Sequence, residues 1–101
     1  MKNSFPTPAE ENLLDRTTLD AYLIDNREAS FMLRVSGNAM QEAGICEGDF
    51  VIVERAVEAK RGDIVIAAID GVWKMKYFDT IQAKTSYSIT AVVKAVVRKY
   101  A

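Results

Sequence analysis

The fold is decided by one stretch, Gly62–Phe78, which reads GDIVIAAIDGVWKMKYF. Its first half, Ile64–Ile69, is a run of branched and small apolar residues, which is typical of a buried strand. Asp70-Gly71 follows, and this dipeptide favours a two-residue hairpin turn of type I′ because both residues accept a positive φ. In the second half, Val72–Phe78, large apolar side chains alternate with lysines, and this period of two predicts the return strand.

Three further segments are predicted strands by the same kind of pattern: 31–35, 50–53 with the charged end Glu54-Arg55, and 89–97. The Ala and Lys content of 89–97 leaves a helix as the alternative. Helical spacing is confined to 17–25, capped by Thr17 or Thr18, and to a turn at 39–43. We therefore predict a mostly β domain over 17–101, a small clip-like or barrel-like sheet with one or two short helices, after an extended arm over 1–16.

Composition excludes several classes of function. The 101 residues include 13 Lys and Arg, 14 Asp and Glu and no His, which gives a net charge of −1. Without a basic excess, the chain is not expected to bind DNA directly, because phosphate neutralisation supplies much of that affinity. The lack of histidine removes the Ser-His-Asp and Cys-His mechanisms and most zinc sites, so we expect no metal or cofactor.

Location and membrane contact follow from the same composition. No apolar run reaches the length of a membrane span, about 20 residues, and the N-terminus has no signal-peptide pattern. We therefore expect no contact with a membrane. A single cysteine, Cys46, fits a reducing cytoplasm, and it is expected to be a packed turn residue because no histidine is present to activate its thiol.

Two positions suggest chemistry from the residues alone. The first is the junction Ser36–Met40 (SGNAM), where a predicted strand breaks into a helical turn. Such junctions present a side chain beside several backbone N–H groups, and the plain alternative is an ordinary glycine turn. The second is Lys76, which lies among large apolar side chains, where desolvation lowers the pKa of an amine and frees it to act as a base. The plain alternative is a solvated lysine on an exposed strand face, beside Lys74.

Taken in order, these segments resemble the LexA/UmuD family. The run Phe31–Met40 is similar to the family's active-site segment, whose pattern is Ser-Gly-x-Ser-Met. Gly44–Asp49 matches its Gly-Ile-x-x-Gly-Asp turn, and Gly62–Gly71 matches its strand and hairpin. Lys76, five positions after Gly71, falls where the family has its catalytic lysine, and Ser4–Ala9 resembles the stretch just after the UmuD self-cleavage site. The resemblance implies the fold of the LexA/UmuD C-terminal domain.

The resemblance also assigns chemical roles. The family uses a Ser-Lys dyad, in which a neutral lysine deprotonates a serine that attacks a peptide bond in the protein's own N-terminal arm. Lys76 takes the general-base position. Ala39 takes the nucleophile position, where a methyl group cannot attack a carbonyl, so the site is expected to be vestigial and the chain not to be an enzyme. Because only Met1–Ser4 precede Phe5, the cleavable bond is expected to be absent as well, as in the already-processed homologues of bacteriophages.

Partners follow from the same resemblance. UmuD loses its arm with the help of RecA on single-stranded DNA, and the product pairs as a dimer with the polymerase subunit UmuC in SOS-induced, mutagenic translesion DNA synthesis. We therefore expect a homodimer and a UmuC-type partner, and we also consider a RecA–single-stranded DNA filament and a heterodimer with a host UmuD-type protein. The valine-rich run 89–97 is expected to supply part of the interface or of the core, and Trp73 is either an interface anchor or an ordinary strand residue.

Three alternatives keep the same fold. The first is a self-cleaving domain into which a Ser→Ala substitution was engineered at position 39. The second is a peptidase that uses Ser36, the nearest hydroxyl, as its nucleophile. The third is the dimerisation domain of a repressor, for which the arm would be too short to hold a DNA-binding helix-turn-helix.

Overall fold

The computed structural model describes residues 16–55 and 57–101. Their elements, in chain order, are the helix α2 (Leu19–Leu23), the 3₁₀ turn η1 (Arg27–Ala29), β1 (Ser30–Arg34), η2 (Gln41–Ala43), β2 (Phe50–Glu54), β3 (Ile64–Ile69), β4 (Val72–Tyr77), η3 (Phe78–Thr80) and β5 (Tyr87–Val97). The predicted arm over 1–16 lies outside the described residues, except for Arg16. None of the described helices combines the length and the apolar composition that a membrane span requires.

The five strands form one antiparallel sheet in the order β1-β2-β5-β3-β4, which confirms the predicted mostly β fold. β5 is the central strand. Its first half pairs with β3, and its second half pairs with β2. The predicted strand over 89–97 is thus confirmed, its helical alternative is wrong, and the valine-rich run contributes to the core, where Ala91 and Val92 are each 3% exposed.

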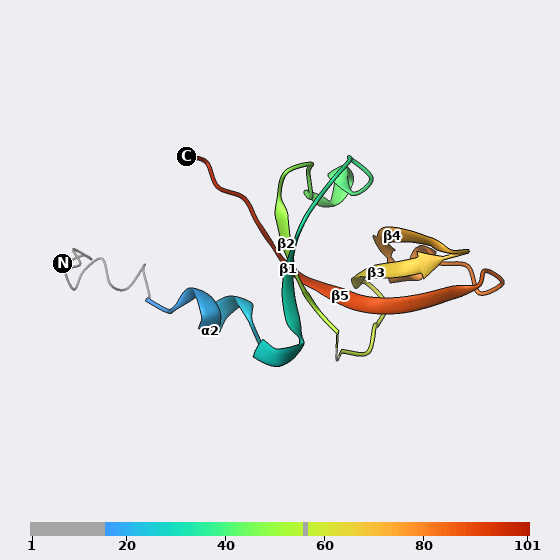
Figure 1. Ribbon diagram of the computed structural model, residues 1–101, viewed down its shortest axis with the longest axis horizontal. Helices are drawn as coiled ribbons and strands as arrows, with labels where there is room; N and C mark the ends of the chain where they lie inside the picture. The colour runs from blue at the N-terminus through green and yellow to red at the C-terminus, as the bar shows by residue number, and fades with distance from the viewer. Residues whose placement is uncertain (1–15, 56) are drawn as a thin grey trace.

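Two β-bulges bend this central strand. An extra residue in β5 interrupts each pairing, Thr90 opposite β3 and Lys94 opposite β2. Each bulge increases the local twist of the sheet, and Figure 1 shows β5 as a long, curved ribbon that links the β3–β4 hairpin to the crossing of β1 and β2. Because of this coiling, the loop that follows β1, at one edge of the sheet, can meet β4 at the other edge.

The local predictions hold at the turns and differ by a residue or two at the helices. Asp70 and Gly71 have φ values of 51° and 83°, both positive as a type I′ hairpin requires. Thr18 caps α2 by accepting a hydrogen bond from the N–H of Ala21 at 3.0 Å, but the helix ends at Leu23, before the predicted Asp25. The turn predicted over 39–43 is a 3₁₀ turn that begins only at Gln41.

The core consists of two clusters, and the adjacent residues Ala91 and Val92 of β5 belong to one each, because successive side chains of a strand point to opposite faces of the sheet. The first contains the buried residues Val35, Met40, Ile45, Val51, Val53 and Ala91, with Ile66 and Met75 packed against it. The second contains Val65, Ala67 and Val92. The first cluster matters for the site, because three of its members come from the loop between β1 and β2, which is thereby fixed on the sheet.

The burial of two groups on β1 and β2 departs from the usual rule that large apolar side chains are inside and charged ones outside. In β1, Phe31, Met32 and Leu33 are 42%, 59% and 43% exposed, because β1 is an edge strand with a neighbour on one side only. In β2, the predicted charged end is partly inside the molecule: Glu54 is 5% exposed, and its Oε1 atom is buried with no hydrogen-bond partner among residues 16–55 and 57–101.

Candidate active site

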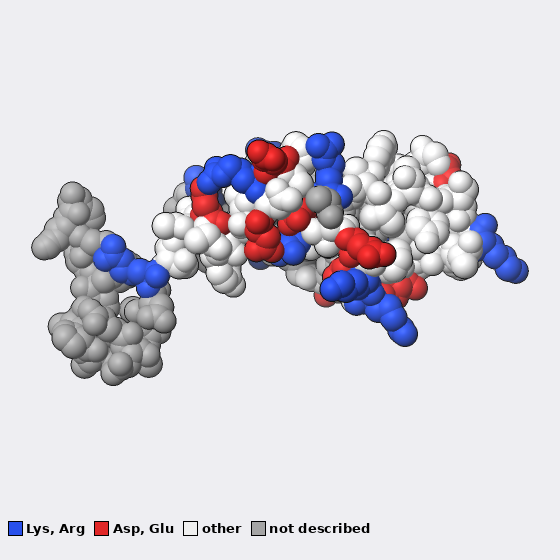
Figure 2. Space-filling model, turned by 90° about the horizontal axis from the view of Figure 1, so that it is seen from below, with Lys and Arg blue, Asp and Glu red and all other residues white. Residues whose placement is uncertain are grey.

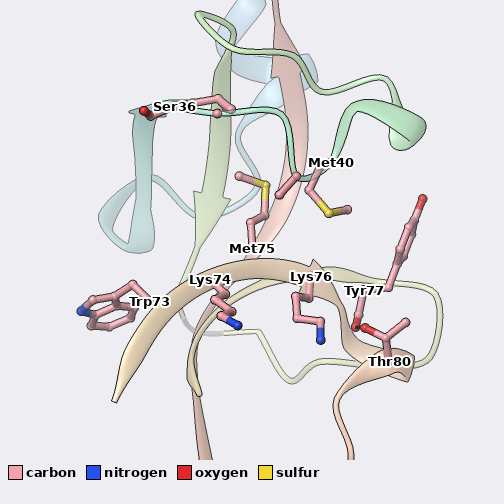
Figure 3. A pocket seen from close by; sticks show the side chains of 11 residues that line it. Ser36, Met40, Trp73, Lys74, Met75, Lys76, Tyr77 and Thr80 are labelled. Carbon is pink, nitrogen blue, oxygen red and sulfur yellow. Dashed lines mark hydrogen bonds between the residues drawn. The ribbon is translucent and has the colours of Figure 1, made fainter. Parts of the chain in front are cut away.

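A cleft of about 510 Å³ lies between the loop after β1 and the strand β4 (Figure 3). Its lining residues are Val35, Ser36, Gly37, Ala39 and Met40 from the loop, Trp73, Lys74, Met75, Lys76 and Tyr77 from β4, and Thr80 from η3. The two positions singled out from the sequence, Ala39 and Lys76, therefore line the same cleft, although 37 residues separate them in the chain.

The loop wall is built so that Ala39 faces outward. Val35 is buried and forms two backbone hydrogen bonds across the loop: its N–H donates to Asp49 at 2.8 Å, and its carbonyl accepts from Gly48 at 2.9 Å. Gly37 turns the chain with a φ of 89°, a conformation that residues with a Cβ rarely adopt. Met40 then returns to the core at 8% exposure. Ala39, between these two buried anchors, is exposed in the cleft.

The β4 wall presents lysines and aromatic side chains. In Figure 3 the Met75 side chain extends from β4 toward Met40, whereas those of Lys74 and Lys76 extend to the other side of the strand, as the alternation of side chains along a strand requires. Lys74 is exposed, and Lys76 is half-buried opposite the fully buried Val65 of β3. Neither lysine forms an ion pair with any residue of 16–55 or 57–101.

The remaining candidate residues divide between the cleft and the rest of the surface. Ser36 lines the cleft, but Figure 3 shows its hydroxyl directed away from Lys76, which gives no support to the peptidase alternative that uses it. Trp73 also lines the cleft and is 64% exposed. Cys46 is a half-buried turn residue, as expected, and does not line the cleft. Within the described residues, no group of three or more His, Cys, Asp or Glu side chains is placed to hold a metal ion.

One feature of the site was not predicted from the sequence. The buried carboxylate of Asp49 accepts hydrogen bonds from Nε and Nη2 of Arg98, each at 2.7 Å, and from the N–H of Cys46 at 2.8 Å. The bonds from Arg98, followed by the bond from Cys46, lower the pKa of Asp49 from 3.8 to about 2, although burial acts in the opposite direction. The same contacts raise the pKa of Arg98 above its ordinary value. Asp49 is therefore a permanent anion at neutral pH, paired in a bidentate geometry.

Comparison with known proteins places this cleft in a family context. The sequence profile described as Peptidase S24-like matches residues 2–91, which include both walls of the cleft. Similar proteins include ImpA of Salmonella typhimurium, 43% identical over 72 residues, which are 71% of this chain and 50% of ImpA. SamA of Salmonella typhimurium strain LT2 is 39% identical over 72 residues, 71% of this chain and 51% of SamA. The LexA repressor of Sorangium cellulosum is 44% identical over 73 residues, 72% of this chain and 32% of the repressor.

Both kinds of relative are longer than the matched region. The chain spans about half the length of ImpA and SamA and about a third of the LexA repressor. The comparison therefore supports the resemblance of the cleft-bearing domain to the LexA/UmuD family.

Proposed function

The chain belongs to the Peptidase S24-like family, and on this premise we propose that it is a catalytically silent, UmuD′-like accessory subunit. In this proposal it supports SOS-induced translesion DNA synthesis by binding, as a homodimer, to a UmuC-type polymerase subunit in the cytoplasm. The observation that carries the proposal is the methyl group of Ala39 in the cleft that contains Lys76.

The reason lies in what the family's dyad requires. A lysine amine takes the proton of a serine hydroxyl, and the resulting oxygen nucleophile attacks a peptide carbonyl carbon. The methyl group of Ala39 has no acidic proton and no lone pair, so no acyl intermediate forms at this position. Activity through Ser36 would need its hydroxyl to face Lys76, and it is directed away from it.

The cleft is still suited to bind a peptide segment. β4 is an edge strand, so one side of its backbone has no partner strand among the described residues, and an extended segment can pair with it. Lys74 and Lys76 have no carboxylate partner within 16–55 and 57–101, and Trp73 and Tyr77 offer exposed aromatic surface. These features support binding in place of cleavage.

The opposite edge of the sheet supports association with another protein. Phe31, Met32 and Leu33 expose large apolar side chains on the open strand β1, and soluble chains usually cover such an edge. In contrast, the face shown in Figure 2 has its lysines and arginines interspersed with acids, not gathered into the basic stripe that is typical of nucleic-acid binding. A RecA filament and a host UmuD-type protein are further proposed partners, taken from the family resemblance alone.

Complementation combined with a measurement of mass tests this proposal. The chain, expressed in a bacterium that lacks UmuD and retains UmuC, is expected to restore damage-induced mutagenesis, and light scattering is expected to give the mass of a dimer. Met32→Glu, on the exposed edge of β1, should weaken the dimer and reduce mutagenesis together, whereas Lys84→Glu, at an exposed loop position, should leave both unchanged. A folded monomer that restores nothing would refute the proposal.

A second candidate is a self-cleaving domain in which the nucleophile has been replaced at position 39. The observation that favours it is the retention of the opposing wall, where Lys76 is half-buried and forms no ion pair with the described part of the chain. A substrate test distinguishes the two candidates: cleavage by Ala39→Ser of a UmuD-type arm supplied in trans favours the second, whereas a serine that reacts with a fluorophosphonate but leaves that arm intact favours an accessory subunit.

A further inference from the structure

We infer that Arg98 is a positioning residue for the cleft. Its hydrogen bonds to Asp49 and Gly44 restrain both ends of the loop segment that carries Ala39. Arg98 lies just after the end of β5, 59 residues from Ala39, and it does not line the cleft. Its guanidinium makes three hydrogen bonds, two to the carboxylate of Asp49 at 2.7 Å and one to the carbonyl of Gly44 at 2.9 Å.

The first connection runs through Asp49 to the start of the loop. The backbone carbonyl of Asp49 accepts the N–H of Val35 at 2.8 Å, and the N–H of Gly48 donates to the carbonyl of Val35 at 2.9 Å. The Asp49 side chain also accepts the N–H of Cys46 at 2.8 Å, which closes the turn 46–49. Holding the Asp49 carboxylate therefore holds Val35, the residue that immediately precedes the segment 36–39.

The second connection runs through Gly44 to the end of the loop. Gly44 ends the turn η2, and its N–H donates to Gln41 at 2.9 Å. The carbonyl of Met40 accepts the N–H groups of Ala43 at 3.0 Å and Ile45 at 3.2 Å. Fixing the Gly44 carbonyl therefore fixes η2 and Met40, the residue that immediately follows Ala39.

The segment 36–39 is thus flanked by Val35 and Met40, and hydrogen bonds connect both of these residues to the guanidinium of Arg98. The backbone of this segment makes few hydrogen bonds. Among the described residues, its only backbone–backbone hydrogen bond is the one that the carbonyl of Asn38 accepts from the N–H of Gln41 at 3.2 Å. The planar fork of an arginine can engage two carboxylate oxygens and a carbonyl at once, whereas a lysine is a single point charge. Arg98 therefore sets where position 39 lies relative to β4, without touching the cleft.

Amide NMR spectra of the chain and of its variants, all with Ala39 unchanged, test this inference directly. Arg98→Ala is expected to shift or broaden the amide resonances of Gly37, Asn38 and Ala39, and Arg98→Lys should produce a smaller change. Arg27→Ala is the control, because Arg27 forms an exposed ion pair with Asp20 at 2.9 Å and does not line the cleft, and it should leave these three resonances unchanged. If Arg98→Ala leaves them unchanged too, Arg98 has no positioning role.

A second test measures the reactivity of the cleft. It rests on the proposed dyad geometry, and every variant in it also carries Ala39→Ser. With the serine restored, Arg98→Ala is expected to slow labelling by a fluorophosphonate by about 10²-fold, the cost of a displacement of the order of 1 Å, and Arg98→Lys should recover part of the rate. Val92→Ala, in the second core cluster and on the central strand, controls for a general loss of stability. An equal slowing by Val92→Ala and Arg98→Ala, per folded molecule, would refute a positioning role. If Ala39→Ser is not labelled at all, the dyad fails, and the amide spectra alone decide the role of Arg98.

Discussion

The substitution Ala39→Ser returns an oxygen to the one position where the family's chemistry needs it. Ala39 is exposed in a cleft of about 510 Å³, so the added Oγ atom requires no rearrangement of the core. Exposed substitutions of this kind change the unfolding free energy by less than about 0.5 kcal/mol. The variant should therefore fold like the parent chain, and any new reactivity is due to the hydroxyl.

The size of the expected effect comes from the base. A positioned general base accelerates proton transfer by about 10²–10⁴-fold, so Ala39→Ser should react with a fluorophosphonate that much faster than Ala39→Ser combined with Lys76→Ala. Lys74 provides the control, because it lines the same cleft and extends to the same side of β4 in Figure 3. Ala39→Ser combined with Lys74→Ala should keep most of the rate. In Figure 3 the Lys76 side chain extends to the side of β4 opposite Met75 and Met40, so the measured rate includes the free energy of moving the Lys76 amine to position 39.

Intact-mass spectrometry measures the covalent adduct directly, and circular dichroism confirms that each variant is folded. Two results would show that the reasoning is wrong. One is a folded Ala39→Ser variant that stays unlabelled, which means that the cleft does not preserve the dyad geometry. The other is an equal loss of rate in the Lys74→Ala and Lys76→Ala backgrounds, which means that the cleft responds to total positive charge and not to a specific base.

Four further outcomes are expected. Met40→Ala should lower the unfolding free energy by about 2–3 kcal/mol in urea titration, because it removes buried atoms and leaves a cavity in the first core cluster. Gly71→Ala should cost about 1–2 kcal/mol in the same measurement, because its φ of 83° disfavours any residue with a Cβ. Glu54→Met should raise the unfolding free energy by about 1–3 kcal/mol, because it removes a buried oxygen that has no partner among the described residues, and a decrease would mean that Glu54 has one elsewhere. Because the pKa of Asp49 is about 2 when folded and ordinarily 3.8, its contribution to stability should be complete above about pH 4 and lost as the pH falls through about 2, a loss that an acid titration of Asp49→Asn should not show.

Sequence patterns predicted the elements whose signal is local. Ile64–Ile69 matches the observed β3 at both ends, and Asp70-Gly71 forms the expected turn, because a period of two and a positive-φ dipeptide need no distant partner. The sequence failed where tertiary context decides. The alternation in 31–35 predicted a strand but not its exposure, which depends on tertiary contacts, and β1 has a single neighbouring strand. The burial of Glu54 has the same origin, since a charged strand end normally indicates the surface.

The residues of the cleft and those that support it show the same difference between local signals and tertiary context. Ala39 and Lys76 could be found because each lies inside a short motif, and the family resemblance supplied the link between them. Arg98 lies outside every such motif, and its partners Asp49 and Gly44 are 49 and 54 residues away. In the sequence it is one of two basic residues that end a valine-rich strand, and only the register of β5 beside β2 brings it to the turn 44–49. The central strand of the sheet is therefore followed directly by the residue that fixes the wall of the cleft, so a change at the end of β5 should alter the environment of position 39.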